Sequence, residues 1–177
     1  DYKERLQEWE LDEIPTGVTT DEDRIYATVA GEHKNGVYFL SASDPSKKEF
    51  IETASGACAP LVNNGNCKLY VCNQFAGTVS ELDKNGSAVL RTVKVLREPK
   101  SAVLDKDGKH LFVTNFLPMQ RADLDTVAAC VSVIDVENFR KIKDIQLANG
   151  SNALRGMSLS PDGRYLLITH NLGRFQV

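Results

Sequence analysis

A repeated pattern of apolar segments is the feature that most constrains the fold of this chain. The clearest copy, Ser101–Asn115, has one apolar segment, the turn dipeptide Asp107-Gly108, and a second apolar segment that ends in Asn. Leu69 and Leu111 in neighbouring copies lie 42 residues apart, a spacing typical of a four-stranded β-propeller blade. The other copies of the second segment are Lys68–Asn73, Arg164–His170 and, in a weaker form, Arg24–Val29.

The periodicity of these segments predicts strands. Their apolar residues alternate with a period of two and are rich in Val, Ile, Tyr, Phe and Thr, whereas helical repeats of similar length would need a period of 3.6. Asn64-Gly65 and Asn85-Gly86 are dipeptides that adopt positive φ and close tight hairpins. The sequence therefore predicts an all-β fold, a partial β-propeller of about three and a half four-stranded antiparallel blades.

The repeat also divides the chain into units. Residues 1–13 are expected to hold a strand, at about 6–12, that completes a blade, with a short helix as the alternative. Residues 14–177 are expected to form the partial propeller, with blades at about 14–54, 55–97 and 98–150 and an incomplete one at 151–177. The inner strands should bury a set of side chains between blades, namely Tyr70, Val71, Leu111, Val113, Leu166 and Ile168.

Composition excludes several classes of partner and cofactor. A formal net charge of -3 without a basic cluster argues against nucleic-acid binding, and no apolar stretch approaches the roughly 18 residues of a membrane span. The four cysteines lack paired spacing and neighbouring histidines, so neither a metal site nor a cofactor is predicted. Cys58 and Cys72 should lie opposite each other in a hairpin, where a disulfide is possible and two buried thiols are favoured.

Several strings resemble a known repeat family. Leu69-Tyr-Val-Cys-Asn73, Leu111-Phe-Val-Thr-Asn115, Val131-Ser-Val-Ile-Asp135 and Ser160-Pro-Asp-Gly163 resemble the YVTN-type β-propeller repeat over about residues 14–171. The resemblance implies an exported bacterial protein, at the cell surface, in a surface layer or in the periplasm. The stretch from Phe116 to His170 also looks like propeller modules beside c-type haem peroxidase-like domains, which implies a docking role.

One face of the predicted propeller gathers the candidate ligand-binding residues. In a blade, the connection between the second and third strands and the connection to the next blade share a face. The long insertion at about 116–128 lies there, where it could bind a ligand or only pack on the next blade. The candidates on this face are Asn73, Arg97, Asn115, Arg121, Asp123, Asp125, Arg155 and His170.

Two of these candidates have competing roles. His170 could bind a metal, act as an acid or base, or hydrogen-bond a loop carbonyl, which is favoured because neither other histidine is expected nearby. Arg155 could bind an anion or form a salt bridge with Asp123 or Glu98.

The function hypotheses rest on the predicted ligand-binding face and on the absence of known catalytic motifs from the sequence. There is no Gly-x-Ser-x-Gly, phosphate loop or His-Glu-x-x-His, so no catalytic residue is predicted. The first hypothesis is a non-catalytic binding or scaffold module that presents the face to a protein, a glycan or a partner domain. The alternatives are a propeller lactonase-like hydrolase, with a metal or a sugar acid held by the face, and a docking domain for a haem peroxidase-like enzyme. A homodimer that closes one ring is expected, with an open monomer as its rival.

Overall fold

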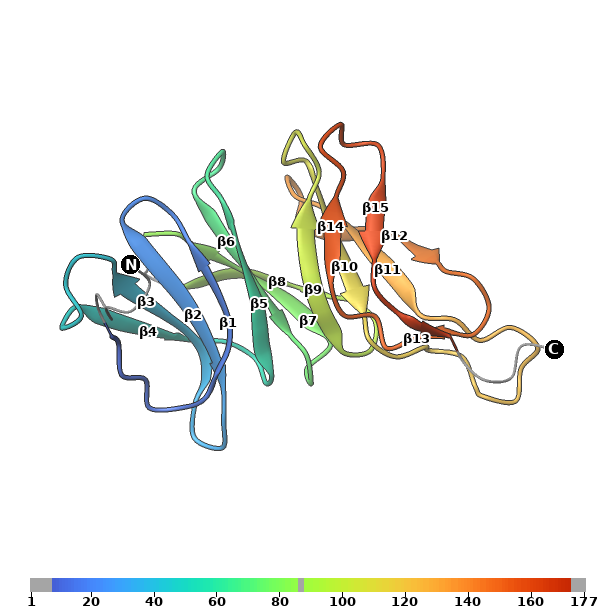
Figure 1. The fold of residues 1–177 in the computed structure, drawn as a ribbon, viewed down its shortest axis with the longest axis horizontal. Helices are drawn as coiled ribbons and strands as arrows, with labels where there is room; N and C mark the ends of the chain where they lie inside the picture. The colour runs from blue at the N-terminus through green and yellow to red at the C-terminus, as the bar shows by residue number, and fades with distance from the viewer. Residues whose placement is uncertain (1–7, 86–87, 173–177) are drawn as a thin grey trace, which may run out of the picture.

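The computed structural model describes residues 8–85 and 88–172, and within them every regular element is a strand. Three four-stranded antiparallel sheets follow one another along the chain, and each keeps its strands in sequence order (Figure 1). The first sheet contains β1 (Pro15–Thr20), β2 (Arg24–Ala30), β3 (Asn35–Ser41) and β4 (Lys48–Glu52). The second contains β5 (Ala57–Asn63), β6 (Lys68–Asn73), β7 (Thr78–Asp83) and β8 (Val89–Lys94). The third contains β9 (Pro99–Leu104), β10 (His110–Asn115), β11 (Cys130–Asp135) and β12 (Arg140–Gln146).

A fourth unit has two small sheets. The hairpin of β14 (Met157–Leu159) and β15 (Leu166–Ile168) takes the place of the first two strands of a blade, and β13 (Ser151–Asn152) pairs with β16 (Asn171–Leu172). The first strands of successive units, β1, β5, β9 and β14, lie side by side on one side of the molecule (Figure 1). The all-β, partial propeller fold is thus confirmed.

The hairpin turns agree only partly with the turn predictions. Gly108 has φ +69 and Gly163 has φ +75, as an Asp-Gly turn requires. In the β5–β6 turn, however, Cys67 adopts the positive φ, 55°, that was expected at Asn64-Gly65. The side chain of Asn63 closes that turn, because its Oδ1 accepts the backbone N–H of Gly65 at 3.0 Å. Gly86 of the other predicted turn lies outside the described residues.

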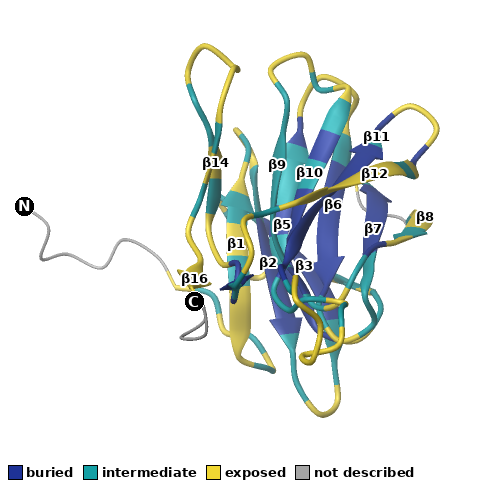
Figure 2. Cartoon of the chain, turned by 90° about the vertical axis from the view of Figure 1, so that its right-hand side faces the viewer, coloured by how far each residue is buried: buried dark blue, intermediate teal, exposed yellow. Residues whose placement is uncertain are grey.

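The core consists of layers between sheets that pack face to face. On β6, Leu69 and Val71 pack against the first sheet, whereas Tyr70 and Cys72 pack against the third. All four side chains are fully buried, and Figure 2 shows β6 among the buried strands. A strand between two sheets buries side chains on both faces, so the apolar residues of β6 run continuously and do not alternate with the expected period of two.

The predicted core residues are confirmed in the complete sheets and only half-buried in the fourth unit. Tyr70, Val71, Leu111 and Val113 are completely buried. Leu166 and Ile168 are intermediate in exposure, because β15 has β14 as its one partner strand in the described part of the chain.

The expected strand at about 6–12 does not form in residues 8–12, and residues 6–7 lie outside the described chain. Residues 8–14 instead cover the outer face of the first sheet, where Trp9 and Leu11 pack beside Tyr38 and Leu40. Trp9 Nε1 donates to the carbonyl oxygen of Ser41 at 3.2 Å. Side chains, and not a strand ladder, hold this segment. No helix in the described part of the chain is long and apolar enough to cross a membrane.

The cysteine prediction is confirmed. Cys58 and Cys72 are paired across β5 and β6, and both are buried free thiols. Burial raises the pKa of each thiol, so both stay protonated near neutral pH.

A buried carboxylate ties the second sheet to the third. Arg91 on β8 binds both oxygens of Glu81 on β7, with Nε–Oε1 at 2.9 Å and NH2–Oε2 at 2.8 Å. The guanidinium also donates to the carbonyl oxygen of Glu137 at 2.9 Å and lies 5.1 Å from the ring centroid of Phe139. Arg91 therefore neutralises a charge that is 2% exposed and contacts the next sheet with the same group.

We expect Leu111→Ala to lower the free energy of unfolding by about 3 kcal/mol, because the truncation leaves a cavity between the second and third sheets. The matched variant Leu167→Ala removes the same atoms from a side chain that is 60% exposed, and should cost less than about 0.5 kcal/mol. Urea unfolding measures both values. Equal losses would contradict the layered core.

We expect Arg91→Met to destabilise the protein by about 2–4 kcal/mol, because it leaves the buried Glu81 carboxylate without a counterion. The control is Arg121→Met, which breaks an ion pair whose side chains are 81% and 62% exposed, and should change stability by less than about 0.5 kcal/mol. Thermal and urea unfolding of both variants check the difference. A small effect at Arg91 would show that Glu81 can lose its partner without cost.

Candidate functional site

The predicted face is present at one end of the sheets, along the lower edge in Figure 1. We call it the loop face. It contains the connections between second and third strands, at 31–34, 74–77 and 116–129, and those between units, at 53–56, 95–98 and 147–150.

Asn73 and Asn115 end β6 and β10 on the loop face, but both side chains are completely buried. Asn115 Nδ2 donates to the carbonyl oxygen of Cys130 at 2.9 Å and to Ser132 Oγ at 3.0 Å, and its Oδ1 accepts the backbone N–H of Leu96 at 3.1 Å. Asn73 Nδ2 donates to Thr78 Oγ1 and Ser80 Oγ. These amides hold the loops in place and are not accessible to a ligand.

The insertion packs on the connection to the fourth unit. Asn149 holds it on both sides, since its Nδ2 donates to the carbonyl oxygen of Asp125 and its Oδ1 accepts the backbone N–H of Val127, each at 2.9 Å. Arg121 and Asp123 pair with each other at 2.6 Å and are exposed. The insertion therefore has a structural role, packing on the next unit, as the sequence analysis considered. Two of its charged residues, Arg121 and Asp123, neutralise each other.

A pocket of about 380 Å³ lies on the loop face between the second and third sheets. We call it the loop-face pocket. Two large apolar side chains stand exposed in it, Phe75 at 71% and Met119 at 53%. Arg97 also lines it, and its NH1 donates to the carbonyl oxygen of Pro118 at 3.5 Å. The residues that line it are Gln74, Phe75, Ala76, Gly77, Lys94, Val95, Leu96, Arg97, Glu98 and Met119.

The backbone of the β6–β7 turn explains why Phe75 points outward. Its N–H donates to the carbonyl oxygen of Ser55 at 3.2 Å, and Gly77 N–H donates to the carbonyl oxygen of Asn73 at 3.0 Å. A Cβ at Gly56, where φ is +82, would lie 2.7 Å from Phe75 N, so only glycine permits this approach. Sequence reasoning missed Phe75; an aromatic residue inside a short polar turn was the available signal.

Arg155 and His170 lie in the fourth unit and do not join the loop-face pocket. Arg155 is exposed, and its guanidinium lies 5.3 Å from the ring centroid of Phe116. The salt bridge considered for Arg155 does not form, because Asp123 pairs with Arg121 and Glu98 accepts a bond from Gln74 Nε2. His170 Nδ1 donates to the carbonyl oxygen of Asn171 at 3.2 Å, the role that the sequence favoured. Among residues 8–85 and 88–172, no group of three or more His, Cys, Asp or Glu is placed to hold a metal ion.

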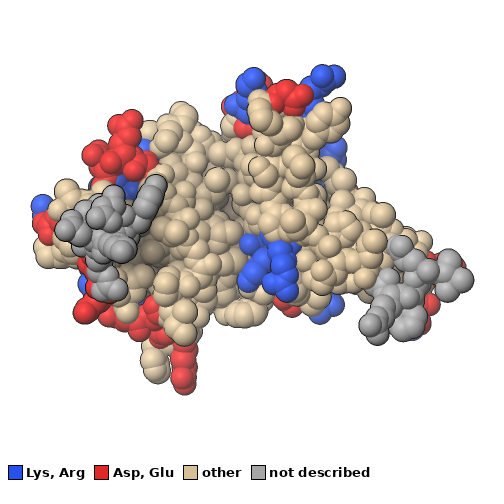
Figure 3. Space-filling view, in the orientation of Figure 1, with Lys and Arg blue, Asp and Glu red and all other residues tan. Residues whose placement is uncertain are grey.

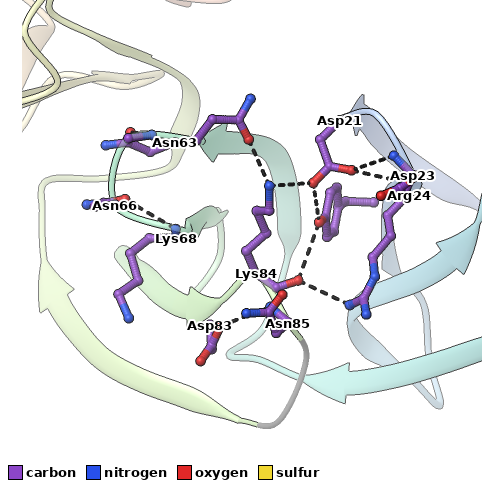
Figure 4. A network of polar contacts seen from close by, with 12 residues as sticks. Asp21, Asp23, Arg24, Asn63, Asn66, Lys68, Asp83, Lys84 and Asn85 are labelled. Atoms are coloured by element: carbon purple, nitrogen blue, oxygen red, sulfur yellow. Dashed lines mark hydrogen bonds and ion pairs between the residues drawn. The ribbon is translucent and has the colours of Figure 1, made fainter.

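The opposite end of the sheets has a second pocket, of about 530 Å³, whose polar groups satisfy one another (Figure 4). Asp21 accepts Lys84 Nζ at 2.9 Å and Tyr26 OH at 2.8 Å, and the backbone N–H of Arg24 at 3.0 Å. Lys84 also donates to Asn64 Oδ1 at 3.0 Å. The network joins loops of the first and second sheets, so its role is structural.

This network controls the protonation of Asp21. Burial acts to raise the pKa of the Asp21 carboxyl, but the bonds from Lys84, Tyr26 and the backbone outweigh it and lower the pKa to about 2. Burial, and then the neighbouring Asp21 carboxylate, raise the pKa of the Tyr26 hydroxyl.

The pKa of Asp21 predicts a contribution to acid stability. Because the folded pKa lies below the unfolded value of about 3.9, the carboxylate stabilises the fold at higher pH and loses that effect as pH falls from about 4 to about 2. We expect Asp21→Asn to flatten this part of the stability curve, measured by urea unfolding at several pH values. Asp107→Asn, at an exposed turn, is the control and should keep the wild-type slope. A wild-type slope in Asp21→Asn would contradict the assignment.

Models of known protein families do not match this chain, and curated protein sequences give no match either. Solved structures of β-propeller-type proteins do match. Hydrazine synthase of Kuenenia stuttgartiensis is 19% identical, with 97% of this chain and 60% of that chain covered and a TM-score of 0.59. Hsv2 of Kluyveromyces lactis is 17% identical, with 96% and 50% covered and a TM-score of 0.65.

A candidate 6-phosphogluconolactonase of Bacteroides uniformis is 18% identical, with 87% of this chain and 46% of that chain covered and a TM-score of 0.61. The chain thus spans between 46% and 60% of the lengths of these three proteins. At such identities the likeness concerns the fold alone. This chain is similar to β-propeller proteins in architecture.

Proposed function

We propose that this chain is a non-catalytic β-propeller binding module that presents the loop-face pocket to a protein partner. The observation that carries the proposal is the exposure of Phe75 and Met119 side by side with charged groups in one pocket on a rigid scaffold. Aromatic residues, Met and Arg are enriched where proteins bind each other, and such anchors contribute most of the binding energy.

The construction of the loop-face pocket supports the binding-module proposal. The backbone of Phe75 is held by Ser55 and by the close approach of Gly56, so the turn that carries the ring loses little conformational freedom on binding. Lys94, Arg97 and Glu98 are the charged residues that line the pocket, so it offers both positive and negative groups. A partner with an apolar side chain flanked by polar groups fits this arrangement.

The proposal also includes the cellular location of the protein and one class of protein partner. The YVTN-type repeat pattern supports an exported or cell-surface bacterial protein, which fractionation of the source cells would test. A haem peroxidase-like enzyme docked by this module would be one such protein partner.

The likeness to a candidate 6-phosphogluconolactonase supports an alternative, a lactonase-like hydrolase. The two functions differ in a direct assay. Hydrolysis of a sugar lactone by the wild type, unchanged in a Phe75→Ala variant, would favour the enzyme and contradict the binding module.

A peptide library displayed on phage tests the binding module, with a glycan array as a parallel probe. Peptides selected on the wild type should bind the double variant Phe75→Ala/Met119→Ala at least about tenfold more weakly, because truncating interface anchors costs 1–2 kcal/mol or more. The control is Leu90→Ala/Ile142→Ala, which removes two apolar side chains that are also exposed, at 44% and 45%, but lie outside the pocket.

Two results would overturn the proposal. Failure to select any peptide or glycan would contradict a recognition role, and equal losses in the two double variants would show that the selected peptides do not use the loop-face pocket. Circular dichroism of both variants checks that their folds are intact.

A further inference from the structure

The first strands of the four units form a continuous surface, which we call the axis-facing surface. It consists of β1, β5, β9 and β14, and β9 contacts both β5 and β14 (Figure 1). In a propeller the first strand of each blade lies nearest the central axis. Groups at the same end of β9 and β14 therefore lie on neighbouring strands of one surface.

Two cations lie at the same end of neighbouring first strands. Lys100 is the second residue of β9, and Arg155 comes two residues before β14. Figure 3 shows that Lys and Arg atoms gather in one cluster in the middle of this surface, over the start of β9. The larger groups of Asp and Glu atoms lie at the margins of that view.

Lys100 is held by an amide. Its Nζ donates to Gln74 Oε1 at 2.8 Å, and Gln74 Nε2 donates in turn to Glu98 Oε2 at 3.1 Å. The amide separates the ammonium from the carboxylate and orients Lys100, and an ammonium has two further N–H groups to offer.

Arg155 is held by its backbone and by an aromatic ring. Its N–H donates to the carbonyl oxygen of Thr169 at 3.1 Å, and its guanidinium rests 5.3 Å from the ring centroid of Phe116. A ring contact fixes the guanidinium while its N–H groups stay free for hydrogen bonds, since a cation–π contact uses none of them.

Within residues 8–85 and 88–172, no carboxylate forms an ion pair with either cation. Lys84, Arg91 and Arg121, in contrast, each form one. Two oriented, unpaired cations on a chain with a net charge of -3 make a local positive region that attracts anions.

We propose that Lys100 and Arg155 form a binding site for the oxyanion group, phosphate or carboxylate, of a small molecule. The planar fork of Arg155 matches two oxygens of such a group, and Lys100 supplies a point charge from the neighbouring strand. Phe116 and Gln74 are positioning residues, because each orients one of the cations. Gln74 also lines the loop-face pocket, but Lys100 and Arg155 do not, and the anion site does not depend on the function of that pocket.

Titration of the isotope-labelled protein, followed by amide NMR shifts, tests the site. The probes are inorganic phosphate, glucose 6-phosphate and gluconate, with glucose as the neutral control; the first two report phosphate recognition and the third reports carboxylate recognition. At low ionic strength, about 20 mM, we expect saturable shifts at Lys100, Arg155 and their neighbours for at least one anion and none for glucose.

Charge-removing variants give the decisive comparison. Lys100→Gln and Arg155→Gln should each weaken anion binding about tenfold or more, since a charge-assisted hydrogen bond is lost. The matched controls are Lys106→Gln and Arg164→Gln, which remove exposed cations in turns at the opposite end of the sheets.

Three outcomes would overturn the proposal. These are the absence of saturable binding by any of the anions, equal weakening in the test and control variants, and shifts that map away from Lys100 and Arg155. Peptide binding at Phe75 and Met119 should survive in Lys100→Gln and Arg155→Gln, so a failure of one proposal is distinguishable from a failure of the other.

Discussion

The structure depends on the burial of both faces of strands in the middle of a sheet, such as β6. Leu69 and Val71 of β6 complete the layer shared with the first sheet, and Tyr70 and Cys72 complete the layer shared with the third. A single strand thus belongs to two cores, so each sheet is positioned by its neighbours and cannot shift alone. The outer face of the first sheet obeys the same constraint, because Trp9 and Leu11 of the N-terminal segment cover it.

Several polar groups buried by this packing form bonds across connections, and these bonds hold the loop ends in place. Asn115 joins β10 to β11 and to the connection that follows β8, while Glu81 and Arg91 join the second sheet to the third. A buried amide or carboxylate without partners would cost about 1–3 kcal/mol or more, so these residues specify one arrangement of the loops. Phe75 and Arg97 are presented on that fixed frame.

The sequence predicted the strands that an apolar segment and a turn dipeptide can reveal. The bounds of β6 agree with the predicted segment Lys68–Asn73, and β10 ends at Asn115 as predicted, because both are largely apolar runs that end in Asn. It could not reveal β13 and β16, since two-residue strands have no periodicity, or the path of residues 8–12, which side-chain packing decides. Asn73 and Asn115 were placed at the correct end of their strands, but only the tertiary structure shows that their side chains turn inward.

Lys84 and Lys100 show how one residue type serves two ends of the same scaffold. Lys84 forms an ion pair with the buried carboxylate of Asp21 and donates to Asn64. Its charge is therefore neutralised and does not attract a ligand. Lys100 is also oriented, but by the amide of Gln74, which carries no net charge and cannot neutralise it. Because Lys100 is oriented but not neutralised, it loses less conformational entropy when it binds an anion and still attracts that anion. The end of the molecule with incomplete electrostatic pairing, and not the end with the tightest network, is therefore where recognition is expected.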